Sequence, residues 1–148
     1  MQTELMVRAV HKGGMHVEAS AGQFHIAMDY PLKDGEPIAG PTPLTMLLAS
    51  LAACSVNSMM AVLKRMQQPV KGLSVDAHAT RSTEHPTVLT KIALEFSVEG
   101  EGVDGAAVAR ALQVSEERLC PVWNMLKPST PIAASYHLQR EPAETADR

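Results

Sequence analysis

The chain has 148 residues and a mass of 15.9 kDa, a length typical of one compact domain, and we expect a single domain over residues 1–148. Hydrophobic residues make up 45% and charged residues 20% of the chain, a composition that excludes a disordered polymer, a collagen-like repeat and a small disulfide scaffold. The net charge of −3, the 3% of aromatic residues and the lack of a Lys or Arg run argue against a nucleic-acid partner.

The N-terminal part of the chain predicts β-strands. Residues 4–10 and 14–28 alternate apolar and polar side chains, with breaks at Gly13-Gly14 and Ala21-Gly22, and we expect about three strands there. The first fifteen residues are interrupted by charges and contain no continuous apolar segment. They do not resemble a secretory signal, and we therefore expect a cytoplasmic, reducing setting.

Residues 31–43 predict an ordered loop, because they contain four Pro and two Gly. Thr42 is the expected N-cap of the helix that follows, and Pro43 suits the first helical position.

Residues 43–66 predict a long apolar helix. One stripe of side chains recurs at three- and four-residue steps; its members are Leu44, Leu47, Leu48, Leu51, Met59, Val62 and Met66. Leu63 and other apolar residues lie off this stripe, so the helix is apolar nearly all round. No charge occurs between Glu36 and Lys64, as in a membrane span, but prolines near the start and four polar side chains in the middle argue against one. We expect a buried central helix, covered by a sheet and by a second copy of itself.

The second half of the chain predicts two strands, a helix and a last strand. Residues 70–82 and 88–99 alternate as a hairpin. Residues 104–119 show helical spacing with Asp104 as N-cap, Pro121 begins a short helical turn, and residues 132–139 form the last strand. Helices interleaved with hairpin strands are typical of an α+β fold in which helices cover an antiparallel sheet.

Two cysteines are the candidate chemical groups, and in a reducing setting they indicate free or redox-active thiols. Cys54 shares one helix face with Ser50 and Ser58, each four residues away. A small buried hydrophobe is the alternative interpretation of Cys54. Cys120 precedes a Pro-initiated turn, where exposed N–H groups favour a thiolate, and simple packing under Trp123 is its alternative.

A combination of motifs carries a family resemblance. The stretch Gly40-Pro41-Thr42-Pro43-Leu44 precedes an apolar helix with Ala52-Ala53-Cys54, and a second cysteine follows a later helix in Cys120-Pro121-Val122. Over nearly its whole length the chain resembles the osmotically inducible protein C and organic hydroperoxide resistance superfamily. The resemblance implies an α+β fold in an intertwined homodimer, with antiparallel sheets around two long central helices and active sites at the subunit interface.

The resemblance also implies a thiol-dependent peroxidase that acts on organic hydroperoxides. Cys54 would match the peroxidatic thiolate, which becomes a sulfenic acid, and Cys120 would match the resolving thiol, which forms a disulfide with it. An external dithiol would restore both thiols. We expect no cofactor and no membrane. We also expect no metal, since the chain has no Cys-x-x-Cys pair and its histidines lack metal-ligand spacing.

Two positions depart from the superfamily pattern, in which an Arg after a Gly-Gly turn and a Glu ten residues before the first cysteine hold the thiolate. Met15 and Leu44 occupy these positions here. A buried thiolate without a cation has a raised pKa, so the alternative function is a redox-sensitive or small-ligand-binding dimer without efficient turnover. Arg8 and His16 are candidates to supply the missing positive charge.

Overall fold

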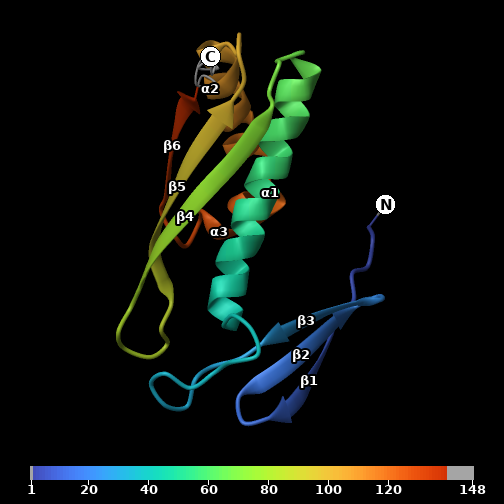
Figure 1. Cartoon of the computed structure of the whole chain (residues 1–148), viewed down its shortest axis with the longest axis vertical. Helices are drawn as coiled ribbons and strands as arrows, with labels where there is room; N and C mark the ends of the chain where they lie inside the picture. The colour runs from blue at the N-terminus through green and yellow to red at the C-terminus, as the bar shows by residue number, and fades with distance from the viewer. Residues whose placement is uncertain (1, 140–148) are drawn as a thin grey trace, which may run out of the picture. The chain divides into compact units, whose positions relative to one another are not determined.

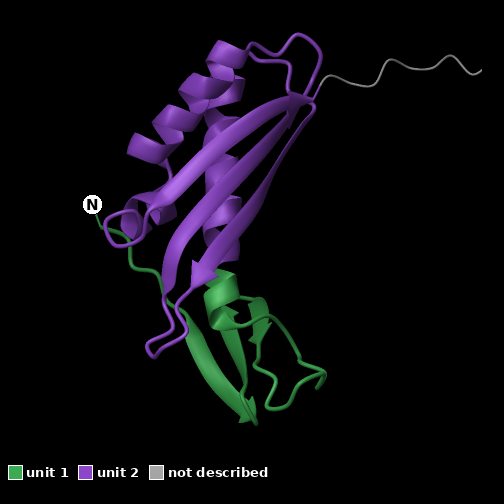
Figure 2. Cartoon of the chain, turned by 90° about the vertical axis from the view of Figure 1, so that its left-hand side faces the viewer, with its two compact units in different colours: residues 1–47 green, residues 48–148 purple. Residues whose placement is uncertain are grey.

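The computed structural model describes residues 2–139, and its elements follow the expected order of three strands, a long helix, two strands, a helical region and a last strand (Figure 1). The chain divides into two compact units, Met1–Leu47 and Leu48–Arg148 (Figure 2). The expectation of one domain over residues 1–148 stays a prediction.

Unit 1 contains a three-stranded antiparallel sheet. Its strands are β1 (Arg8–Gly13), β2 (His16–Ala21) and β3 (Phe24–Met28), hydrogen-bonded in the order β1-β2-β3. Gly14 and Gly22 lie in the two connecting turns with φ values of 54° and 59°, a left-handed conformation that glycine adopts without a Cβ clash. The two glycine breaks in the sequence therefore mark the strand ends.

The long helix α1 (Pro43–Arg65) begins where the sequence predicts. The Thr45 N–H donates to the Thr42 hydroxyl at 3.2 Å, and the Met46 N–H donates to the Thr42 carbonyl at 2.9 Å. These bonds confirm Thr42 as the N-cap and Pro43 as the first helical residue.

Unit 2 contains a second three-stranded sheet, which differs from the antiparallel expectation in one strand. The strands β4 (Gly72–Arg81) and β5 (Leu89–Glu99) form the expected antiparallel hairpin. The last strand, β6 (Ile132–Gln139), runs parallel to β5. The direction follows from the connection between them, because a helical crossover returns the chain to the same end of the sheet before the next strand begins.

That crossover consists of three short helical segments. Helix α2 (Gly105–Val114) begins after Asp104, whose carboxylate accepts a hydrogen bond from the Ala106 N–H at 3.0 Å, and the predicted N-cap is thereby confirmed. The expected helix over 104–119 does not continue as an α-helix after Val114. It passes into one turn of π-helix, η1 (Ser115–Leu119), and the short helix α3 (Pro121–Leu126) follows.

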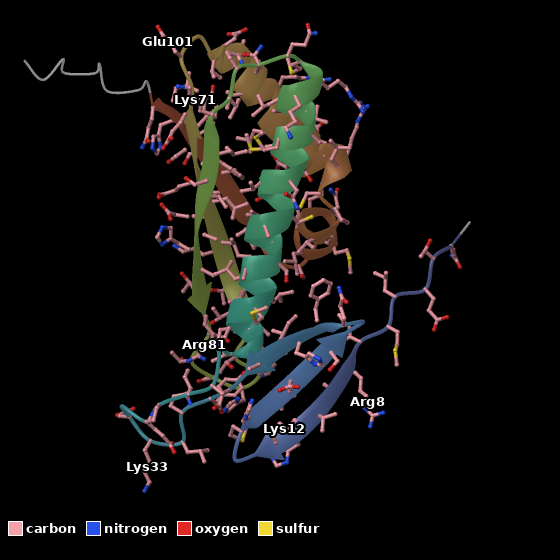
Figure 3. All side chains as sticks on the ribbon, turned by 45° about the vertical axis from the view of Figure 1, so that its right-hand side comes forward. Arg8, Lys12, Lys33, Lys71, Arg81 and Glu101 are labelled. Atoms are coloured by element: carbon pink, nitrogen blue, oxygen red, sulfur yellow. The ribbon has the colours of Figure 1, made fainter. Side chains whose placement is uncertain are left out.

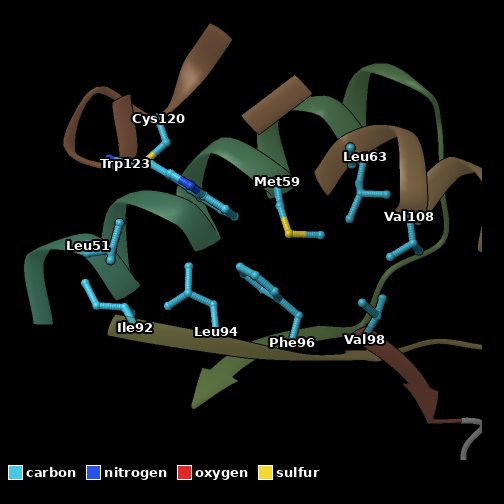
Figure 4. Packing of buried hydrophobic residues seen from close by; sticks show 11 residues of the cluster. Leu51, Met59, Leu63, Ile92, Leu94, Phe96, Val98, Val108, Cys120 and Trp123 are labelled. Atoms are coloured by element: carbon cyan, nitrogen blue, oxygen red, sulfur yellow. The ribbon is translucent and has the colours of Figure 1, made fainter. Parts of the chain in front are cut away.

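The core of unit 2 lies between α1, β5 and the helical crossover (Figure 4). Its largest buried apolar side chains are Leu51, Met59, Leu63, Leu94, Phe96, Val98, Val108 and Trp123. The fully buried residues of α1 recur every four residues and include Leu63, which the predicted stripe left out, and Ser55. Ser55 is tolerated in this line because its hydroxyl donates to the Ala52 carbonyl of the same helix at 2.8 Å.

Most residues of α1 are not fully buried within the described chain. Its most apolar 18-residue window has a mean hydropathy of 1.8, and 22% of that window is buried. By length and composition alone such a helix can cross a membrane, but the core helix of a soluble protein passes the same test. The uncovered surface leaves room for a further partner of α1.

Candidate active site

Cys54 lies in the middle of α1, beside the buried line of that helix. It is a free thiol and is half-buried, and its side chain packs against the hydrophobic core. Its neighbour along the chain, Ser55, is fully buried. Cys54 therefore lies at the boundary between the core and the uncovered surface of α1.

Cys120 lies at the junction of η1 and α3 and is fully buried. Its N–H donates to the Ser115 carbonyl five residues earlier at 3.0 Å, which is the bond that closes the π turn. The Asn124 side-chain amide donates to the Cys120 carbonyl at 2.8 Å. These bonds fix the backbone of Cys120 on both sides of the thiol.

The structure brings the two thiols together. The Cys54 thiol and the Ser58 hydroxyl, one helical turn beyond it, lie near enough to the Cys120 thiol to shift its pKa. The Trp123 N–H donates to the Cys120 sulfur at 3.5 Å. Figure 4 shows Cys120 next to Trp123, above Leu51 and the β5 side chains Ile92 and Leu94. The catalytic role of the pair stays a prediction, and so does a disulfide between them.

Burial dominates the electrostatics of Cys120 and raises the pKa of its thiol from 9.0 to about 11. The neighbouring Cys54 adds to this rise, whereas the Trp123 N–H and the Ser58 hydroxyl oppose it. The sequence suggested that a helix N-terminus would favour the thiolate of Cys120. That expectation is wrong for the net pKa, because the loss of solvent around the thiol outweighs the effect of the N–H donor. The alternative interpretation, packing with Trp123, agrees with the structure, since both residues belong to the buried core.

The residues considered for the missing charged partners all lie in unit 1, whereas both cysteines lie in unit 2. Arg8 is an exposed side chain on β1 (Figure 3), and His16 is half-buried on β2, where its Nε2 has no hydrogen-bond partner in the described structure. Met15 and Leu44 supply no charge. A contribution of Arg8 or His16 to Cys54 therefore stays a prediction.

Sequence reasoning identified both cysteines and placed Ser58 on the face of Cys54, but it missed the proximity of Ser58 to Cys120 and the π turn. The four-residue spacing between Cys54 and Ser58 indicated that they share one helix face, but this spacing does not identify the residues that pack against that face. Within residues 2–139, no three His, Cys, Asp or Glu side chains gather as a metal site would require.

Comparisons with known proteins relate this chain to one family. The pattern of the OsmC-like proteins matches residues 33–135. Protein YhfA of Escherichia coli K12 is 35% identical over 98 residues, which cover 66% of this chain and 73% of that protein. A solved OsmC-like protein of Mycoplasma pneumoniae superposes with a TM-score of 0.81 at 22% identity, covering 93% of this chain and 99% of that one. A solved organic hydroperoxide resistance protein of Elizabethkingia anophelis gives 0.68 at 18% identity, covering 94% and 100%. The structural likeness confirms the α+β fold of OsmC-like proteins.

The raised pKa of Cys120 predicts that the reduced protein loses stability at high pH. Between pH 9 and 11 the folded state keeps the Cys120 proton that the unfolded state has lost, so the free energy of unfolding falls as pH rises through this interval, by about 2 kcal/mol. Urea unfolding in reductant should show a smaller fall for Cys120→Ala, since lysines and tyrosines titrate equally in both proteins. Parallel pH curves for the two proteins would contradict the assignment.

Proposed function

The chain belongs to the OsmC-like protein family, and from this premise we propose that it is a thiol-dependent peroxidase that reduces organic hydroperoxides. The family and its solved neighbours named as organic hydroperoxide resistance proteins support a redox role in the stress response. The proposal assigns Cys54 as the peroxidatic thiol and Cys120 as the resolving thiol.

One observation carries this assignment: a half-buried thiol lies near a fully buried one. A peroxide that arrives from solvent meets Cys54 first, since Cys120 has no exposed surface. A pKa of about 11 also keeps Cys120 protonated at neutral pH, and the thiolate is the nucleophilic form. Cys120 is therefore poorly suited to the first attack and well placed for the second.

The proposed reaction has two steps within the chain. The Cys54 thiolate attacks one peroxide oxygen, an S–O bond forms as the O–O bond breaks, and the alkoxide leaves and takes a proton to become an alcohol. The Cys120 sulfur then attacks the Cys54 sulfenic acid, an S–S bond forms as the S–O bond breaks, and hydroxide leaves with the Cys120 proton as water. An external dithiol reduces the disulfide by thiol–disulfide exchange and returns both cysteines to thiols.

The surroundings of Cys54 support an alkyl hydroperoxide as substrate. No charged residue occurs between Glu36 and Lys64, so the polar groups of α1 near the thiol are uncharged. Leu48 and Val56 of the same helix pack with Cys54 against the core. An alkyl tail gains about 0.8 kcal/mol for each CH₂ group that it buries on such a surface.

The proposal includes a homodimer in the cytoplasm. A second copy of the chain is the proposed cover for α1, because most residues in the apolar window of this helix are only partly buried or exposed within one chain and association would bury their apolar surface further. A reducing compartment suits the chemistry, since it supplies the electrons that regenerate two free thiols.

The peroxidase proposal predicts that one equivalent of an organic hydroperoxide converts the reduced protein to a Cys54–Cys120 disulfide within one chain. In Cys120→Ser the sulfenic acid at Cys54 should persist and react with a dimedone-type trap, because the resolving thiol is gone. Peptide mapping by mass spectrometry reads both results. Thiols that stay reduced at neutral pH after peroxide treatment would favour the alternative, a redox-sensitive or ligand-binding dimer without efficient turnover.

The absence of charge at Met15 and Leu44 predicts slow alkylation of Cys54 at neutral pH. The thiolate is the nucleophilic form of cysteine, and no charge at these two positions stabilises it, so alkylation of Cys54 in Cys120→Ser should be slow at pH 7. If Arg8 or His16 supplies the charge instead, Arg8→Ala or His16→Ala slows the reaction at pH 7. Fast alkylation at pH 7 that neither substitution slows would place the activating group elsewhere.

The homodimer proposal predicts one sedimenting species of twice the chain mass at micromolar concentration. The uncovered apolar surface of α1 gives the reason, since its burial against a second copy stabilises association. A folded monomer in sedimentation velocity at that concentration would overturn the dimer.

A further inference from the structure

A hollow of about 500 Å³ lies on the sheet of unit 2. Ile92 and Leu94 of β5 point into the core between the sheet and α1, and side chains alternate along a strand, so Lys91 and Ala93 lie on the opposite face. In Figure 2 this face is turned toward the viewer, with α1 behind the strands. Lys91 and Ala93 line the hollow together with residues of β4 and β6. The sheet therefore separates the hollow from Cys54, which packs on the core side.

Two alanines form the floor of this hollow. Ala93 of β5 and Ala133 of β6 are paired in register, and His78 of β4 is the neighbour of Ala93 on its other side. Alanine carries only a methyl group, whereas Lys91 and Glu95, two positions to either side of Ala93 on the same face, have long side chains. The hollow arises because side-chain volume is missing in the middle of the sheet, and its floor is apolar.

One end of the hollow is positively charged. Lys91 is paired in register with Thr80 of β4, so an ammonium group and a hydroxyl lie on neighbouring strands and on one face. No ion pair of Lys91 occurs within residues 2–139. The other titratable side chain of the lining, His78, has a partner, since its Nε2 lies 3.6 Å from Glu95 Oε2. Lys91 and Thr80 can therefore donate to an anionic group of a ligand.

Acidic side chains beside the hollow limit the charge of that ligand. Asp76 and Glu95 are paired in register on the same face, one step along the sheet from the pair of His78 and Ala93. Their carboxylates repel a second negative charge, and a phosphate monoester carries a charge of about −1.5 to −2 at neutral pH. A carboxylate carries one negative charge, which matches one lysine, and its two oxygens can accept from two donors.

We propose that this hollow binds a small monocarboxylate with an apolar body, such as a medium-chain fatty acid. The carboxylate accepts hydrogen bonds from Lys91 and Thr80, while the alkyl chain lies over Ala93 and Ala133. The volume of about 500 Å³ falls in the range of small-molecule sites, roughly 300–1,000 Å³. The inference goes beyond the peroxidase proposal and does not rest on it, since neither cysteine lines the hollow.

The test titrates the protein with octanoate and follows alanine methyl groups labelled with ¹³C by NMR. The methyl signals of Ala93 and Ala133 should shift and saturate, with half-saturation at about 1 mM. Ala134 is the internal control, because it follows Ala133 on β6 but packs against the core on the other face, and its signal should stay in place. No saturable shift of Ala93 and Ala133, even about tenfold above that concentration, would overturn the proposal.

Two further ligands separate the charge from the alkyl chain. Octanamide has the same chain without the charge and should bind about fivefold more weakly, the upper value for an ion pair near the surface. Acetate has the charge without the chain and should not saturate the shifts. Equal half-saturation for octanoate and octanamide would overturn the proposal, and so would octanoate shifts confined to the exposed Ala53 of α1.

Variants test the lining residues themselves. In Lys91→Gln the half-saturation concentration of octanoate should rise about fivefold, whereas Lys64→Gln, which removes the same charge from α1, should leave it unchanged. Ala93→Leu fills the floor and should abolish the Ala133 shift, whereas Ser74→Leu adds the same side chain to this face outside the lining and should preserve it. If Ala93→Leu does not fold, the two lysine variants still decide, and equal values for them would refute the proposal.

Discussion

The packing of α1 against the η1–α3 junction, which brings Cys54 near Cys120, is the interaction on which the candidate site depends. One thiol belongs to the long helix α1 and the other to the junction of η1 and α3, and the core of Leu51, Met59 and Trp123 holds these segments together. The crossover between β5 and β6 carries the second thiol back over the sheet. The pair therefore exists only in the folded chain, and its chemistry is a property of the packing.

The same packing determines the electrostatic environment of the two thiols. Burial removes Cys120 from water and raises its pKa to about 11, and the structure opposes this rise with neutral donors, the Trp123 N–H and the Ser58 hydroxyl. The superfamily resemblance leads one to expect a charged pair beside the thiolate, and Met15 and Leu44 provide none. This chain places the two thiols near each other, and α1 carries no charged residue before Lys64 that could activate Cys54.

Local chemistry made most of the fold predictable from the sequence. The apolar periodicity of α1 and β5 arises because each buries one side, and the caps at Thr42 and Asp104 are formed by residues close in sequence. The parallel direction of β6, the π turn before Cys120 and the proximity of Ser58 to Cys120 depend on the path of the whole chain, which no short window contains. The site was therefore only partly predictable, because the sequence identified both thiols but not the groups that surround the Cys120 sulfur.

The central claim is that the fold holds Cys54 and Cys120 as one dithiol. The redox equilibrium of the reduced protein with glutathione tests this claim most directly. In buffers that range from reduced to oxidised glutathione, two species should account for the intact mass, the dithiol and a form two hydrogens lighter. A mixed disulfide at Cys54 should not accumulate, since a neighbouring thiol displaces glutathione. A stable glutathione adduct on Cys54, with Cys120 still free, would contradict the account.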